Sequence, residues 1–288
     1  MKIKFFADYE RPVNLLKRVI ANYDIFDDDL TFTTGNDYDF AVVFNNTKEV
    51  LSQKARIITI MQEPTWSDIN RSNPFLTYSD YIIIHDRLLF EDFFQIQLGG
   101  HVIESPSYMF FHDQVDHSFF KGTEELPKNK KISIILSSLK FETGNYGKRL
   151  KLLRKILSSD LDIDIYGRGL YVNDDRYLGE LKYKHTGLIP YEYSIALENC
   201  NERNYVTEKF FDCSLCNTVP IYNGAPNIEE VYNDKYFRLI DLNSPDVVDQ
   251  IKDIIKYPAP KAGPDNNKKR YFNRYNLYNK LKEIILND

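Results

Sequence analysis

Short apolar runs alternate with segments of helical spacing along the first third of the chain. Strands are predicted at residues 3–6, 40–44, 57–61, 81–84 and 101–103, of which 40–44 and 57–61 are continuous apolar runs, and helices are predicted at residues 12–22, 47–52 and 88–97. Runs that are apolar at every position are typical of strands covered on both faces. Their alternation with helices is typical of βαβ units. A parallel α/β domain is therefore predicted here.

The pattern stops between residues 105 and 131, where Pro106 and Pro127 favour a linker, and then resumes. Further strands are predicted at residues 132–136, 163–166, 195–197, 218–222 and 237–240, and helices at 146–157 and 247–257. A final amphipathic helix is predicted at residues 268–286. We expect an N-terminal domain at 1–125, a second α/β domain at 126–265 and a C-terminal helix at 266–288.

Composition narrows the class of protein. The formal net charge of −5 lacks the basic excess that nucleic-acid binding needs, so no nucleic-acid partner is expected. Three cysteines provide no disulfide framework, and no apolar run reaches 18 residues, which together favour a soluble cytoplasmic protein with at most peripheral membrane contact. The 21 Tyr and 19 Phe suit stacking against sugars or bases, but they also suit a large aromatic core.

The stretch at residues 193–226 holds the first candidate site. An apolar strand runs into Glu198-Asn199, and a helix follows Tyr205-Val-Thr-Glu-Lys209. Thr207 can cap that helix, whose free N–H groups, together with Lys209, would bind phosphate. Glu208 would then turn to sugar hydroxyls, because it would repel a phosphate. An ordinary capped helix with a surface Glu–Lys pair is the alternative.

Two more residues lie near predicted strand ends. Arg149 follows a glycine-containing loop at the start of the 146–157 helix, where its guanidinium could bind two phosphate oxygens. Glu63 lies just past the 57–61 strand, beside Pro64 and near the single Trp, and a carboxylate there could act as a general base. Both residue types are also common on ordinary surfaces.

Several other motifs are interpreted as structural. Cys213 and Cys216 have redox spacing but lie inside a predicted helix, which favours buried packing. Alternating acidic residues at 160, 162 and 164 are better explained by a strand edge than by a metal site. Tyr166-Gly-Arg-Gly169 is too short for a dinucleotide fingerprint, and the five histidines have no ligand spacing. No metal site is expected.

The stretch at 193–226 resembles the donor-binding segment of the α1,3/α1,4-fucosyltransferases of glycosyltransferase family ten, particularly the bacterial members. The match consists of the apolar strand, Glu-Asn, a short loop, Tyr-Val-Thr-Glu-Lys, a helix and Pro-Ile-Tyr-x-Gly-x-Pro. It is specific over residues 133–241. Asn223 departs from the pattern, because the family usually has an aromatic residue there, close to the expected sugar.

The resemblance implies a GT-B architecture, in which two facing Rossmann-like domains with parallel sheets enclose a cleft. The first domain would bind the acceptor and the second the nucleotide sugar. The implied donor-binding residues are Arg149, Asn199, Tyr205, Thr207, Glu208, Lys209 and Asn223. Glu63 would be the catalytic base.

The function expected on this basis is inverting transfer of a deoxyhexose, fucose from GDP-fucose, to a hydroxyl of a carbohydrate acceptor such as a lipopolysaccharide or O-antigen glycan. No cofactor or essential divalent metal is expected. Two alternatives stay open at this point. One is a GT-B transferase that uses a different nucleotide sugar, and the other is a protein that binds a sugar nucleotide or glycan without turnover.

Overall fold

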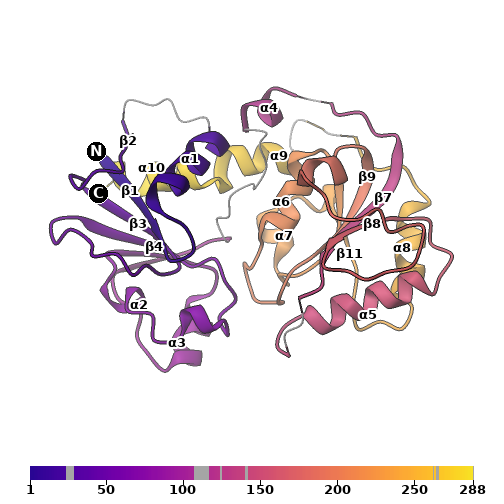
Figure 1. Cartoon of the computed structure of the whole chain (residues 1–288), viewed down its shortest axis with the longest axis horizontal. Coiled ribbons are helices and arrows are strands. Elements are labelled where there is room, and N and C mark those ends of the chain that lie inside the picture. Colours follow the sequence, from indigo (N-terminus) through magenta and orange to yellow (C-terminus); the bar gives the residue numbers. More distant parts are fainter. Residues whose placement is uncertain are drawn as a thin grey trace.

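Two fully parallel sheets form the two halves of the molecule (Figure 1). The computed structural model describes residues 1–23, 29–106, 117–123, 125–139, 142–261, 263 and 266–287. The first sheet contains β1 (Lys2–Ala7), β2 (Thr31–Phe32), β3 (Phe40–Phe44), β4 (Arg56–Ile60), β5 (Tyr81–Ile84) and β6 (His101–Glu104). The second contains β7 (Lys130–Ser137), β8 (Asp164–Arg168), β9 (Tyr191–Leu197), β10 (Val219–Asn223) and β11 (Arg238–Leu239). The expected pair of parallel α/β domains is confirmed.

Both sheets have the same topology. The strand orders are β2-β1-β3-β4-β5-β6 and β11-β10-β9-β7-β8, so in each sheet the second strand is added at one edge of the first and all later strands are added on the other side. Such an order creates a switch point, between β1 and β3 in the first sheet and between β7 and β9 in the second. Ligands of open parallel sheets bind at the carboxyl ends of the strands beside the switch point.

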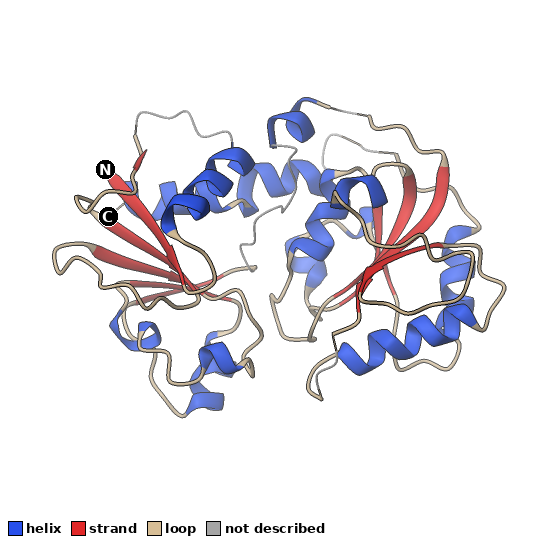
Figure 2. Ribbon diagram, in the orientation of Figure 1, coloured by secondary structure: helices blue, strands red, loops and turns tan. Residues whose placement is uncertain are grey.

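Helices cover the faces of both sheets (Figure 2). In the first half they are α1 (Pro12–Tyr23), η1 (Asp68–Asn70), α2 (Phe75–Tyr78) and α3 (Arg87–Phe94). Those from the second half onward are α4 (His117–Gly122), α5 (Tyr146–Leu157), η2 (Lys184–Gly187), α6 (Glu208–Leu215), α7 (Ile228–Val231), η3 (Asp234–Tyr236) and α8 (Val247–Ile255). In the expected linker, residues 107–116 and 124 lie outside the described residues, and α4 occupies part of the rest.

The helix expected at residues 47–52 is wrong, because this segment is a loop. The amide of Thr47 donates to the side chain of Asn46 at 2.8 Å, and the amide of Glu49 donates to the hydroxyl of Thr47 at 3.2 Å. These local side-chain bonds occupy N–H groups that a helix would need. The apolar residues of the segment were too few to outweigh them.

The C-terminal helix expected at residues 268–286 is interrupted. It consists of α9 (Asn267–Arg270), the π-helical segment η4 (Tyr271–Tyr275) and α10 (Leu277–Leu286). Asn276 has extended backbone angles, and its side chain caps α10 by accepting from the amide of Asn279 at 2.9 Å. The break redirects the chain, which runs from the second sheet back across to the first (Figure 1).

The apolar face of α10 belongs to the core of the first domain. Leu277, Leu281, Ile284 and Ile285 are buried against side chains of β1, β3 and β4. The expected division treats residues 266–288 as a separate helix. In the structure α10 packs with the N-terminal half. Among the described residues, no helix is both long and apolar enough to cross a membrane.

We expect Leu281→Ala to lower the free energy of unfolding by about 2–5 kcal/mol, because it leaves a cavity in this core. Leu286→Ala is the matched control on the same helix, since its side chain is 44% exposed, and it should cost less than about 0.5 kcal/mol. Urea denaturation measures both values. Equal losses in the two variants would contradict the packing of α10 on the first sheet.

Candidate functional site

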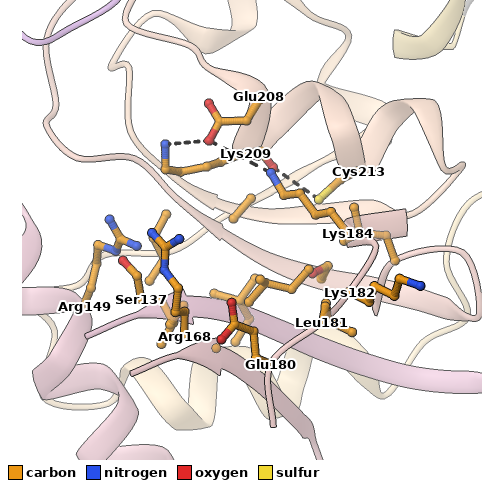
Figure 3. A pocket seen from close by; sticks show the side chains of 18 residues that line it. Ser137, Arg149, Arg168, Glu180, Leu181, Lys182, Lys184, Glu208, Lys209 and Cys213 are labelled. Atoms are coloured by element: carbon orange, nitrogen blue, oxygen red, sulfur yellow. Dashed lines mark hydrogen bonds and ion pairs between the residues drawn. The ribbon is translucent and has the colours of Figure 1, made fainter. Parts of the chain in front are cut away.

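A cavity of about 480 Å³ lies at the carboxyl ends of the strands beside the switch point of the second sheet (Figure 3). Its walls come from the ends of β7, β8 and β9, the starts of α5 and α6, and the segment that leads into η2. The lining residues are Ile135, Leu136, Ser137, Arg149, Gly167, Arg168, Glu180, Leu181, Lys182, Lys184, Leu188, Ser194, Ile195, Ala196, Leu197, Glu208, Lys209 and Cys213. The position is the one that the topology predicts for a ligand.

Cations dominate the polar lining of this cavity. Five lining side chains are basic, and only Glu180 and Glu208 are acidic. In a concave site a local excess of one charge sign concentrates ions of the other sign. The whole chain carries a net charge of −5, so its basic character is locally concentrated here. A multiply charged anion such as a diphosphate fits this lining.

The start of α6 is built around the buried carboxylate of Glu198. Thr207 donates to it through its amide at 2.7 Å and through its hydroxyl at 2.6 Å, while the Thr207 hydroxyl accepts from the amide of Lys209 at 3.4 Å. The expected helix cap at Thr207 is therefore confirmed. Lys209 Nζ lies 3.6 Å from Glu198 and 3.1 Å from Glu208.

Lys209 remains charged in this environment. Although burial acts to lower it, the carboxylates of Glu208 and Glu198 raise the pKa of Lys209 above its ordinary value. Its ammonium group lines the cavity at the helix N-terminus, where the helix dipole also favours an anion. The Glu208–Lys209 contact is the pair anticipated as the alternative, yet it lies inside the cavity and not on an open surface.

Lys184 forms a second ion pair beside the first. It contacts the buried carboxylate of Asp212 on α6 and lies 4.0 Å from Glu208. Burial raises the pKa of Asp212 to about 7, and Lys184 opposes that shift. Lys184 thus links η2 to α6 by an ion pair in the wall of the cavity.

Arg149 projects from the first turn of α5 into the cavity, as expected (Figure 3). Its NH1 donates to Asn199 Oδ1 at 2.6 Å, and its guanidinium lies over the ring of Tyr146 at 5.5 Å. Burial lowers its pKa, although an arginine stays charged at any ordinary pH. Asn199 therefore orients Arg149, and the ring of Tyr146 packs against its guanidinium.

The predicted base, Glu63, belongs to the first domain. It follows β4 and is half-buried. Its pKa is raised chiefly by burial and further by Glu208, while Lys209 acts to lower it. The charges of Glu208 and Lys209 thus act on Glu63 across the two halves, although Glu63 is not one of the residues that line the cavity.

A close contact between loops fixes this approach. Trp66 packs edge-on against Tyr146, with ring centroids 6.3 Å apart. Gly144 has a φ of +67°, and a Cβ there would collide with Asn199 O and lie 2.7 Å from Trp66 Cζ2. Only glycine permits both this backbone conformation and this approach.

Of the predicted site residues, only Arg149, Glu208 and Lys209 line the cavity, whereas Glu63, Asn199, Thr207, Tyr205 and Asn223 do not. Tyr205 is fully buried, and its hydroxyl has no hydrogen-bond partner among the described residues. Burial, followed by Glu63 and Glu198, raises the pKa of that hydroxyl, so it stays protonated. Asn223 ends β10, where its side-chain amide donates to Ile240 O at 3.1 Å.

Sequence reasoning did not assign roles to Arg168, Lys184, Glu198 and Glu202. Arg168 ends β8 and lines the same cavity as Arg149 (Figure 3). Its place at a strand end was a usable signal, as was that of Glu198, which directly follows β9. Lys184 and Glu202 lie in loops whose partners are distant in sequence, and no local pattern distinguishes them.

Of the motifs interpreted as structural, the Cys213/Cys216 pair and Asp164 have the expected packing and edge-strand positions, whereas Arg168 of Tyr166-Gly-Arg-Gly169 lines the cavity. Cys213 lies in α6 and Cys216 caps its C-terminus, and both thiols are buried and unpaired. Burial raises the pKa of Cys213 to about 12, which makes it unreactive. Asp164 begins the edge strand β8 and pairs with Lys130 at 2.6 Å. Among the described residues, no group of three or more His, Cys, Asp and Glu is arranged to hold a metal ion.

A family model matches more than half of the chain. The profile described as glycosyltransferase family 10 (fucosyltransferase), C-terminal region, matches residues 126–285. A fucosyltransferase-like protein of Arabidopsis thaliana is 40% identical over 82 residues, which cover 28% of this chain and 15% of that protein. An α-(1,3)-fucosyltransferase of Helicobacter pylori is 34% identical over 77 residues, or 27% and 16% of the two chains. The matches thus span well under two thirds of these relatives.

Solved structures resemble the chain over most of its length. A crystal structure of an α1,3-fucosyltransferase has a TM-score of 0.53 at 19% identity and covers 94% of this chain and 80% of that one. A crystal structure of an α1,3-fucosyltransferase with GDP-fucose has a TM-score of 0.50 at 18% identity, covering 94% and 80%. At these identities the likeness concerns the fold, and it confirms the expected GT-B arrangement of two parallel-sheet domains.

Proposed function

The chain belongs to glycosyltransferase family 10, and from this premise we propose that it transfers fucose from GDP-fucose to a hydroxyl of a carbohydrate acceptor, with inversion at the anomeric carbon. The observation that carries the proposal is that Lys209 and Glu208, which line the cavity of the second domain, act electrostatically on Glu63 of the first. A base of elevated pKa beside an anion-binding cavity is what sugar transfer from a nucleoside diphosphate requires.

In the proposed reaction Glu63 removes the proton of the acceptor hydroxyl as its oxygen attacks the anomeric carbon. The bond between that carbon and the β-phosphate oxygen breaks, and the diphosphate leaves with the electron pair. Arg149, Lys209 and the N-terminus of α6 take up the developing negative charge. These groups are already in place, so they need no reorganisation during the reaction.

The remaining donor-binding roles follow from the contacts described above. We propose that Asn199 holds Arg149 for the phosphates and that Thr207 keeps the helix start rigid through Glu198. Glu208 would orient a hydroxyl of the ribose or the sugar. Tyr205, whose buried hydroxyl has its pKa raised by burial and further by Glu63, would support the reacting centre, and Asn223 would lie behind it.

The proposal extends to metal use, acceptor and location. Five cavity cations would neutralise the diphosphate without an essential divalent ion. The acceptor would be a glycan of the lipopolysaccharide or O-antigen class, approaching from the side of Glu63. Three buried, unpaired thiols support a cytoplasmic location, with at most peripheral contact with the inner face of the membrane.

A thermal-shift panel of GDP, UDP, CDP and dTDP tests the donor. We expect only GDP to stabilise the protein strongly, since a ligand at about 100 times its dissociation constant adds about 2.7 kcal/mol to the native state. If UDP, CDP or dTDP gives the largest shift, the GDP assignment is wrong. Incubation with GDP-fucose and an acceptor panel, followed by NMR of the new anomeric centre, then tests transfer and inversion. Retention at that centre would contradict the proposed mechanism.

A further inference from the structure

The loop between β9 and α6 connects the donor cavity to the first domain. Glu202 in this loop is 13% exposed, and its Oε2 accepts three hydrogen bonds from the other half of the molecule. The donors are the amide of Thr65 at 2.9 Å, the hydroxyl of Thr65 at 2.8 Å and Nε2 of His85 at 2.6 Å. Thr65 and His85 are themselves almost completely buried.

Two neighbours of Glu202 strengthen the same junction. The side-chain amide of Asn204 donates to the backbone carbonyl of His85 at 2.8 Å. The ring of Tyr205 meets the ring of His85 edge-on, with centroids 5.2 Å apart. His85 directly follows β5, and Thr65 follows β4. The loop therefore grips the carboxyl ends of two adjacent strands of the first sheet.

This junction lies next to Glu63. Thr65 is two residues beyond Glu63, and the intervening Pro64 stiffens the link by fixing its φ angle. On the other side of the loop, Trp66 packs against Tyr146 of α5. Residues 63–66 are thus held at two points by the second domain, once through hydrogen bonds and once through packing.

The hydrogen bonds are of the kind that hold a geometry firmly. Bonds to an ionised acceptor are about twice as strong as neutral ones, and burial shields them from competing water. Although burial acts to raise it, the bonds from His85 and Thr65 hold the pKa of Glu202 below its ordinary value. The carboxylate therefore stays ionised over the working range of an enzyme at neutral pH.

We propose that Glu202 is a positioning residue, which binds the 63–66 loop of the first domain and so sets the location of Glu63 relative to the donor cavity. The proposal rests on the proposed role of Glu63 as base. In this proposal a side chain of the second domain sets the position of the catalytic base of the first domain. The same loop leads directly into the cap and first turn of α6, so the base and the phosphate-binding groups are assembled on one support.

The test compares Glu202→Gln with Arg203→Gln. Arg203 is the adjacent residue, and it also reaches the first domain, but its pair with Glu104 is exposed and 3.6 Å long. We expect Glu202→Gln to reduce kcat about 10- to 100-fold, because small misplacements of a reacting group have effects of this size. The dissociation constant for GDP should stay within about twofold, and Arg203→Gln should change neither quantity appreciably.

Trp66 provides a readout that does not depend on activity, because it is the only tryptophan in the chain and lies in the loop that Glu202 holds. We expect Glu202→Gln to shift its emission to longer wavelength and to increase acrylamide quenching while the protein remains folded. Thr65→Val removes one of the three hydrogen bonds and should produce smaller changes of both kinds. Thr65→Val also tests the proposal if Glu202→Gln does not accumulate as folded protein.

The outcomes separate this proposal from the proposed function. Unchanged Trp66 emission in Glu202→Gln would overturn it, as would a kcat within twofold of wild type. An equal loss of kcat in Arg203→Gln would also overturn it, because general weakening of the domain contact would then suffice. If the wild-type protein transfers no fucose to any acceptor, the proposed function fails, and the Trp66 measurement still decides whether Glu202 holds the loop.

Discussion

Glu63→Gln should abolish most sugar transfer while leaving nucleotide binding unchanged. Glutamine preserves the size of the side chain but cannot accept the proton of the acceptor hydroxyl, and loss of a general base typically costs about 10²- to 10⁴-fold in rate. Lys209 acts electrostatically on Glu63, but Glu63 belongs to the first domain and does not line the cavity, so the proposed GDP site of the second domain should stay intact. Initial rates with GDP-fucose and calorimetric titration with GDP measure the two effects.

Asp68→Asn is the matched control for Glu63. Asp68 lies five positions further along the same connection, and its side chain is 92% exposed in a weak pair with Arg71. Its replacement should leave the rate within about twofold, as expected for an exposed ion pair.

Because burial raises the pKa of Glu63, the wild-type rate should begin to fall on the acid side at a higher pH than an ordinary glutamate would give. Full activity of Glu63→Gln would remove this residue as the base.

Lys209→Met should weaken GDP binding by about 10- to 100-fold. The substitution keeps the aliphatic part of the side chain but removes a charge-assisted hydrogen bond of about 1.5–3 kcal/mol to the diphosphate. If Lys209 contacts the terminal phosphate, the substitution should weaken the binding of GMP less than the binding of GDP. Titrations of both nucleotides measure the difference, and urea denaturation in parallel corrects for the ion pair that the buried Glu198 loses.

Lys151→Met provides the comparison for that experiment. Lys151 lies on the exposed side of α5, one half-turn from Arg149, and it does not line the cavity. It has the same formal charge, so any effect of net charge on nucleotide binding appears in both variants. Affinities of Lys209→Met that match those of Lys151→Met would discard the phosphate role of Lys209.

Much of the second domain could be predicted from the sequence. The helix bounds at residues 146–157 agree with the structure, and Thr207 caps α6 as its position before Glu208 indicates. These features depend on interactions between residues close in sequence, which patterns of spacing describe well. The segment at 47–52 failed for the same kind of reason, since short side-chain bonds to backbone amides outweighed its helical composition.

The assembled site needed the tertiary structure. Glu198 was visible as a residue after a strand, but its binding of Thr207 depends on how β9 and α6 meet. Glu202 and Thr65 are 137 positions apart, and their hydrogen bonds exist only because the carboxyl ends of two sheets face one another. No spacing rule connects such residues, because the chain between them contributes nothing to the contact.

The sequence by itself determined the strands, most helices, the family motif at residues 193–226 and the residue types available for chemistry. Only the tertiary structure decided which of them meet. It placed Glu63 within the electrostatic influence of Lys209, joined Asn199 to Arg149 by a hydrogen bond, and returned α10 to the first domain through the break at Asn276. The physical reason is that local propensity depends on neighbours in the chain, whereas a site depends on desolvation and charge at a place where distant segments pack together.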